Sequence, residues 1–195
     1  RPSSGYGSDL TITGAAGWTG GVLNSTANLA QVVLDGAVAA IAPASEGTVN
    51  LGSKFVLTGG AILTQYVGEI AVTNDNHIID LEDGAKWIVD APGLVGAAIT
   101  GLLDKSFNIS AGSSLSLVSG EWIYNGKCRN AGTFTVGPGV TVTVFAAFIQ
   151  GQSPQDDYWS YKQTGGATYM HGTSHFLTLT GFLIADGILA TKYAQ

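Results

Sequence analysis

The sequence predicts an all-β protein with one short helix near its N-terminus, and three observations support that prediction. Short segments rich in Val, Ile, Thr, Phe and Trp are separated by Gly, Asn or Asp through residues 48–150. A glycine followed by a β-type segment recurs at Gly52, Gly68, Gly84, Gly112 and Gly132. Only 11% of the residues are charged, against about 25% in an ordinary chain.

The spacing of these glycines favours a stacked, repetitive body. The first three lie 16 residues apart, at positions 52, 68 and 84, and the next two follow after 28 and 20 residues, at 112 and 132. A repeating unit favours a β-solenoid-like body. Because the spacing becomes irregular, a jelly-roll or other β-sandwich remains the rival architecture.

The low charge predicts that the protein is oligomeric. Eight basic and 14 acidic side chains give a net charge of −6, and the mean hydropathy is +0.26. A 20.0 kDa monomer exposes about 8,700 Å², which leaves about 400 Å² for each charge. The expected partner is therefore the protein itself, as a trimer, another homo-oligomer or a polymer.

Residues 1–21 are predicted to form an extended N-terminal arm. They are rich in Gly, Ser and Thr and contain one alternating segment, residues 9–13. Leu10 and Ile12 are expected to add as a strand to a neighbouring copy, into which Trp18 inserts. We give equal weight to the alternative that this terminus is disordered or pairs within its own chain.

Residues 22–47 are predicted to contain the helix. Apolar residues from 29 to 41 recur at three- and four-residue spacing, and residues 24–26 offer an N-cap. Gly36 weakens the pattern, and Pro43 ends it.

Residues 48–150 are predicted to form the β-rich repetitive body. Its clearest part is Thr133 to Val136, a Gly-Pro-Gly turn, and Val140 to Val144. Alternation of Val with Thr predicts a sheet with one packed and one exposed face. Residues 151–195 are predicted to form an exposed aromatic loop followed by a C-terminal β segment.

Two segments, Ala111 to Leu117 and Asn130 to Val144, resemble the β-solenoid bodies of phage and viral fibres, spikes and head-decoration proteins. The segments combine glycine-punctuated strands with Ser- and Thr-rich faces. The resemblance implies a homotrimer or other homo-oligomer on the surface of a particle. The expected location is a virion surface or the extracellular space.

An acidic segment, residues 74–84, is a candidate Ca²⁺ site. Asp75, Asp80 and Asp83 bring carboxylate oxygens close together along the chain. Their spacing does not fit an EF-hand, and an acidic turn around Gly84 without an ion is the alternative. We therefore expect no cofactor, with Ca²⁺ as the candidate exception.

An aromatic segment near the C-terminus is a candidate glycan-binding site. Aromatic rings beside carboxylates can stack on a sugar ring and accept hydrogen bonds from it. The same residue types also anchor subunit interfaces, and we weight the interface more heavily. The residues of this glycan-binding or interface set are Asp156, Asp157, Tyr158, Trp159, Tyr161 and Tyr169.

No enzymatic activity is expected. The sequence has no G-x-S-x-G segment and no recognisable pair of catalytic carboxylates. Its basic residues are scattered singly, which argues against a nucleic-acid partner, and no apolar run reaches the length of about 18 residues typical of a membrane span.

Three functions follow, in order of preference. The first is a non-enzymatic structural subunit that self-assembles on a virion surface or into an extracellular filament. The second is a glycan-binding adhesin module that uses the loop around Trp159. The third is a spike that cleaves glycans.

Overall fold

The computed structural model describes residues 9–19, 21–23, 31–41, 48–51, 54–66, 69–72, 79–91, 97–145, 161–171, 175–178 and 182–192. Across these residues the protein is all-β, with 19 strands and no helix, which confirms the predicted class. Every strand pair in this part of the chain is parallel, whereas a jelly roll is built from antiparallel strands.

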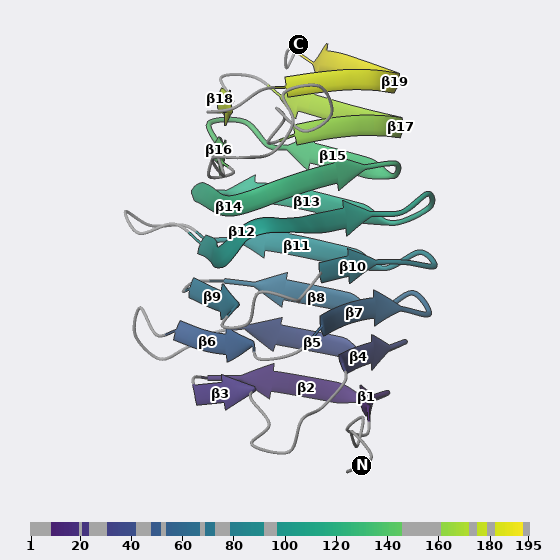
Figure 1. Cartoon of the computed structure of the whole chain (residues 1–195), viewed down its shortest axis with the longest axis vertical. Helices are drawn as coiled ribbons and strands as arrows, with labels where there is room; N and C mark the ends of the chain where they lie inside the picture. Colours follow the sequence, from purple (N-terminus) through teal and green to yellow (C-terminus); the bar gives the residue numbers. More distant parts are fainter. Residues whose placement is uncertain are drawn as a thin grey trace, which may run out of the picture.

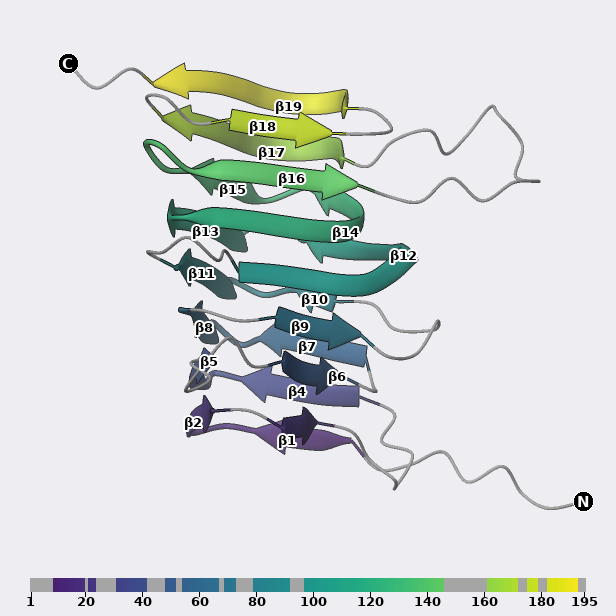
Figure 2. The ribbon, with the colours of Figure 1, turned by 90° about the vertical axis from the view of Figure 1, so that its left-hand side faces the viewer.

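The strands stack in three columns, here called A, B and C, and one strand from each column makes one rung (Figures 1 and 2). Column A contains β1 (Leu10–Ile12), β4 (Gln31–Asp35), β7 (Lys54–Thr58) and β10 (Ile79–Leu81). Column B contains β2 (Ala15–Trp18), β5 (Val38–Ile41), β8 (Ile62–Gln65), β11 (Lys86–Asp90), β13 (Ser114–Ser119) and β15 (Thr133–Val136). Column C contains β3 (Gly21–Leu23), β6 (Thr48–Leu51), β9 (Glu69–Val72), β16 (Thr141–Phe145) and β18 (His175–Thr178).

Four long strands bend around a corner and therefore belong to two columns. They are β12 (Ala97–Ile109), β14 (Glu121–Asn130), β17 (Tyr161–His171) and β19 (Phe182–Lys192). Strands β12 and β14 pair first in column C and then in column A, whereas β17 and β19 pair first in column A and then in column B. The described chain thus winds from β1 at one end of the stack to β19 at the other (Figure 2).

Side chains alternate between the interior of the stack and its surface, as the sequence pattern predicts. In β15, Phe134 and Val136 are buried, while Thr133 and Thr135 are partly exposed. Aromatic rings form a continuous series along the interior, with successive centroids 5.4–6.2 Å apart. In order, the series is Trp18, Phe55, Trp87, Phe107, Trp122, Phe134 and Tyr161.

The corner between columns A and B is narrow and selects small residues. Ala37, Ala61 and Ala85 are fully buried there, one in each of three successive rungs. At the same corner of a later rung, Gly166 has a φ of 60°, and an added Cβ would lie 1.9 Å from the carbonyl oxygen of Gly132. A glycine is therefore required at this position both for its backbone conformation and for lack of space.

The predicted helix is wrong for the part of residues 22–47 that the structure describes. Gln31–Asp35 and Val38–Ile41 are strands, and Gly36 forms the turn between them with a φ of 62°. Val32 and Leu34 point inward and pair with β7, so alternate burial outweighs the apparent helical spacing. Residues 24–30 lie outside the described part.

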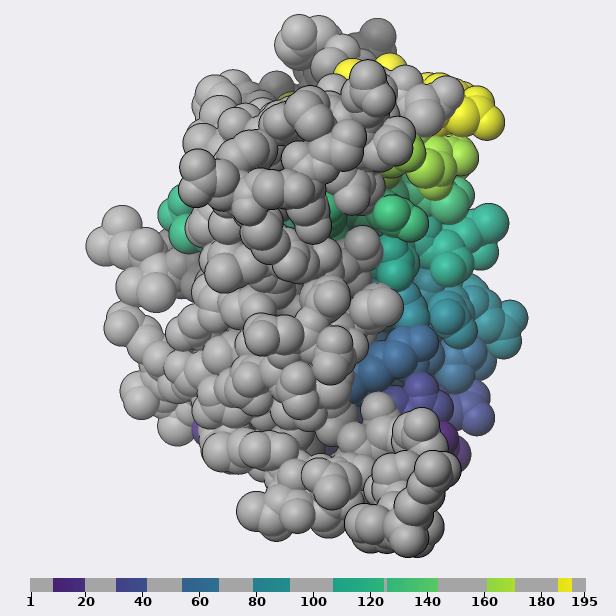
Figure 3. Space-filling model, viewed as in Figure 1, coloured from purple at the N-terminus to yellow at the C-terminus, as the bar shows by residue number. Residues whose placement is uncertain are grey.

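The predicted domain boundaries also change, because the stack includes strands on both sides of residues 48–150. Leu10–Ile12, Ala15–Trp18 and Gly21–Leu23 supply the three strands of the first rung, and β17 to β19 continue the same columns at the other end. Residues 1–8 of the predicted arm lie outside the described part. In Figure 3 the described residues follow one another in sequence order along one side of the surface. The described part is therefore a single stack.

The 16-residue spacing does not correspond to the structural repeat. Gly52 precedes β7 in column A, Gly68 precedes β9 in column C, and Gly84 precedes β11 in column B. Gly84 and Gly112 are equivalent, since each lies two residues before one of the register partners Lys86 and Ser114 at the corner before a column B strand. Gly132 lies directly before Thr133, at a shorter corner. The 28-residue spacing is the distance between two rungs, as in the partners Lys86 and Ser114, whereas the partners Ser114 and Thr133 of the next rung lie 19 residues apart.

Candidate functional site

The outward surface of column A carries a polar ladder. The Lys54 ammonium lies 2.7 Å from one carboxylate oxygen of Asp80, and the Asn108 amide donates to the other at 2.7 Å. Asp80 and Asn108 are register partners on neighbouring strands. In the first rungs, the Gln31 amide donates to Asp9 at 2.9 Å.

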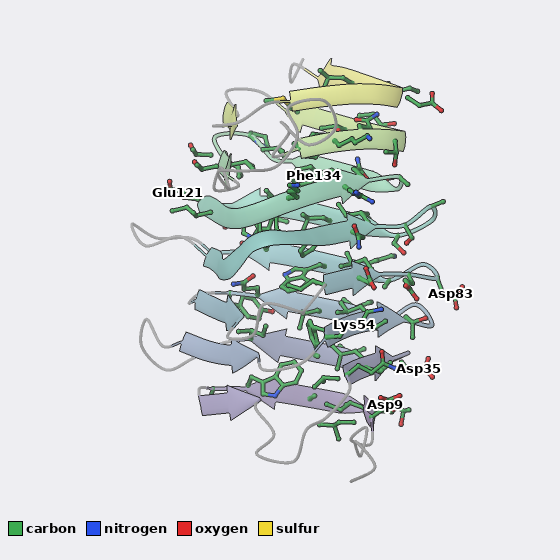
Figure 4. All side chains as sticks on the ribbon, in the orientation of Figure 1. Asp9, Asp35, Lys54, Asp83, Glu121 and Phe134 are labelled. Atoms are coloured by element: carbon green, nitrogen blue, oxygen red, sulfur yellow. The ribbon has the colours of Figure 1, made fainter. Side chains whose placement is uncertain are left out.

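The candidate Ca²⁺ residues do not converge in the part of the chain that is described. Asp80 is held by Lys54 and Asn108 on column A, whereas Asp83 lies in the turn after β10 with a φ of 49°. Figure 4 shows Asp83 at the edge of the stack, on the same side as Asp9 and Asp35. Asp75 lies outside the described residues, and those within them include no group of three potential metal ligands.

The candidate glycan-binding set is divided by the structure. Tyr161 is fully buried, and its ring packs 5.8 Å from that of Phe134, so it offers no surface to a sugar. Tyr169 is partly exposed on the column B part of β17. The other four members, at positions 156–159, lie outside the described residues, and their role stays a prediction.

Tyr161 instead belongs to a buried polar cluster between β14 and β17. The Asn130 amide donates to the Tyr161 hydroxyl at 3.0 Å and to the Ala167 carbonyl at 3.1 Å. The Thr168 hydroxyl donates to Gln163 Oε1 at 2.7 Å and is also hydrogen-bonded to Tyr161. These contacts satisfy side chains that would be costly to bury without partners.

Burial also controls the ionisable groups beside this cluster. Desolvation raises the pKa of the Cys128 thiol. Desolvation, and to a smaller extent the nearby Cys128, also raise the pKa of Tyr124 and of Tyr161. Hydrogen bonds with Thr168 and Asn130 lower the pKa of Tyr161 in part. Cys128 is therefore an inert thiol in the folded protein, as expected of a buried cysteine.

The predicted assembly arm is part of the chain's own stack. Leu10 and Ile12 pair with Val32 and Leu34 of the same chain through β1 and β4, and exchange of this strand between copies stays a prediction. Trp18 packs against Phe55 with ring centroids 6.1 Å apart, rather than extending towards a neighbour. Leu10 remains 39% exposed.

The outward surface of column B differs sharply from that of column A. Its side chains form three files, and the two continuous ones follow the strand register. The first file is Val38, Ile62, Lys86, Ser114 and Thr133. The middle file is Ala40, Thr64, Ile88, Ser116 and Thr135. The third file, at the far end of the strands, is Tyr66, Asp90 and Ser119, and Val118 is exposed beside it where the register between β11 and β13 shifts.

Only Lys86 and Asp90 are charged among these outward residues of column B. Val38 is 61% exposed, Val118 is 50% exposed and Tyr66 is 46% exposed. A flat parallel sheet face with exposed apolar side chains and two charges is a candidate protein interface. Sequence reasoning missed this surface, because its residues come together only when the rung length is known.

The chain matches no protein-family profile, no curated protein and no solved structure. Among the described residues, no helix has the length and hydrophobicity that crossing a membrane requires.

Proposed function

We propose that this chain is the β-solenoid body of a non-enzymatic structural subunit that assembles with copies of itself. The observation that carries the proposal is the outward surface of column B, which exposes Val38, Tyr66 and Val118 and has two charges among its outward residues. An isolated soluble surface is normally richer in charge. Coverage by a second subunit accounts for this composition.

The proposed setting is a virion surface or an extracellular filament. Hydroxyl side chains such as Ser114, Ser116, Thr133 and Thr135 take the place of charges on the outer face of column B. A rigid stack of parallel strands suits an elongated structural part, since each rung extends the body along one axis. The resemblance of this sequence style to fibre, spike and decoration proteins supports the same setting.

The native mass of the purified chain, measured by light scattering with and without a chelator, tests the proposal. We expect a discrete oligomer or an open polymer at micromolar concentration. Loss of the assembly on chelation would show that a bound cation such as Ca²⁺ bridges the copies. A monomer under all conditions would contradict self-assembly and leave the glycan-binding alternative, which Trp159→Ala tests by loss of sugar binding.

A further inference from the structure

The two charged residues of the three files lie at opposite ends of one strand, and a further charged residue of column B, Lys192, ends β19. Lys86 begins β11 and Asp90 ends it, and Ile88 lies between them on the same outward face. Four residues at about 3.3 Å each place the two charged residues about 13 Å apart, too far for a direct ion pair. Asp90 accepts a hydrogen bond of 2.6 Å from the Ser119 hydroxyl of the neighbouring strand.

We propose that column B packs against column B of a second copy, with the two stacks parallel and related by a two-fold axis that runs along them. This inference rests on the proposed self-assembly and specifies its surface and symmetry. This two-fold axis reverses the strand direction in the second copy. Lys86 of each copy therefore faces Asp90 of the other. Ile88 then faces Ile88 at the centre.

The charges discriminate between this arrangement and its antiparallel alternative. A two-fold axis along the strands, centred on β11, places Lys86 against Lys86 and Asp90 against Asp90. Like charges facing each other across an interface are unfavourable, whereas the parallel arrangement forms two opposite-charge pairs. An isologous dimer is also the commonest symmetric assembly.

The neighbouring rungs fit the parallel arrangement as well. In the rung before β11, Ile62 of one copy faces the exposed Tyr66 of the other. In the rung after it, Ser114 faces the far end of β13, where Val118 is exposed and Ser119 is the register partner of Asp90. The apolar end of the surface, at Val38 and Ile62, thus meets the same end of its partner. The hydroxyl-rich end, at Thr133 and Thr135, meets its own counterpart.

The available area is sufficient for a specific contact. Eight strands pair in this column, counting the second halves of β17 and β19. At about 4.8 Å per strand and about 14 Å of width, the face covers about 500 Å² on each copy. The pair would bury about 1,000 Å², which is the lower bound of a specific interface.

Charge reversal tests the proposal in the full chain. Lys86→Asp alone sets two carboxylates against each other, and Asp90→Lys alone sets two ammonium groups against each other. We expect each single variant to dimerise at least tenfold more weakly than the wild type. The double variant, K86D together with D90K, should recover wild-type association, because the two charges exchange places.

Mixing the two single variants gives an independent readout of the same geometry. One variant presents only acids at the two positions and the other only bases, so a one-to-one mixture should form a heterodimer more tightly than either forms a homodimer. Intramolecular damage to folding would not be repaired by mixing. Native mass spectrometry separates the species, because the two variants differ in mass.

Ile88→Lys adds a central probe, with Val33→Lys on the outer face of column A as its matched control. The first should abolish association, and the second should leave it unchanged. Wild-type assembly that withstands Ile88→Lys and both charge reversals would overturn this interface and leave the proposed function standing. A monomeric wild type would overturn both.

Discussion

At equivalent positions, the middle rungs bury apolar side chains and the C-terminal rungs bury polar ones. On column B, the inward residues Trp87, Leu115 and Phe134 are followed by Thr168 in the same register. On column A, Ile109 is followed by Asn130 and then by Gln163. Apolar rungs are held by contact area, which has no direction, whereas polar rungs require a complete set of hydrogen-bond partners.

The largest expected effect is on the apolar side of this comparison. Trp87 is fully buried and its ring touches those of Phe55 and Phe107, at 6.0 and 5.4 Å between centroids. Trp87→Ala should lower the free energy of unfolding by about 3–5 kcal/mol, measured by chemical denaturation. A loss below about 1 kcal/mol would mean that the aromatic series does not hold the middle rungs.

Loss of Asn130 tests the polar side. Asn130→Leu keeps the volume but removes the hydrogen bonds that the Asn130 amide donates to the Ala167 carbonyl and the Tyr161 hydroxyl, which should cost about 2–3 kcal/mol of unfolding free energy. Ile109→Val, one rung earlier in the same register, should cost about 1 kcal/mol. Equal costs for the two variants would remove the distinction between polar and apolar rungs.

Two corner glycines allow the cost of a left-handed backbone conformation to be measured apart from the cost of a steric clash. Gly84 and Gly166 both have positive φ, but an added Cβ meets nothing within 4 Å at Gly84 and lies 1.9 Å from a backbone oxygen at Gly166. Gly84→Ala should cost about 1 kcal/mol, from the left-handed conformation alone. Thermal unfolding should show a clearly larger loss for Gly166→Ala, and the same shift in both would contradict the close packing of the C-terminal corner.

The smallest effect is a pH dependence at the boundary between the two kinds of rung. Burial raises the pKa of Cys128, so above about pH 9 the unfolded chain releases a proton that the folded chain retains. Folding stability should therefore fall as the pH rises through this range. Denaturation at pH 8 and pH 10 should show a smaller loss in Cys128→Ala than in the wild type, and an identical loss would show that the thiol does not contribute.

The β class and many of the strands could be predicted from sequence because alternation is a local property. Thr133 to Val136 is a strand with one buried and one outward face, as its pattern predicts. The apolar residues of the segment from Gln31 to Ile41 fit helical spacing as well as strand alternation. Only the pairing with β7 and β8 decides between a helix and two strands. The local sequence pattern therefore predicts which segments are strands better than it predicts which strands pair with one another.

The candidate sites were harder to predict because they depend on rung length. Tyr161 lies near acids and aromatics in the sequence, yet its register places it above Cys128 in the core. In the sequence, Lys86 and Asp90 do not indicate an interface, since charged residues at the ends of a strand are common. Their arrangement becomes informative only when β11 is placed among neighbouring strands of column B, from β5 to β15, whose outward residues in the three files carry no other charge.

The most direct test of the central claim, parallel self-assembly through column B, is a distance measurement between spin labels on two copies. Thr64→Cys and Thr135→Cys place labels in the middle file at different heights, and the buried Cys128 remains unlabelled. Parallel stacks predict the same short inter-copy distance from both positions, because each label faces its own counterpart. Widely different distances, or no coupling between copies, would contradict the account.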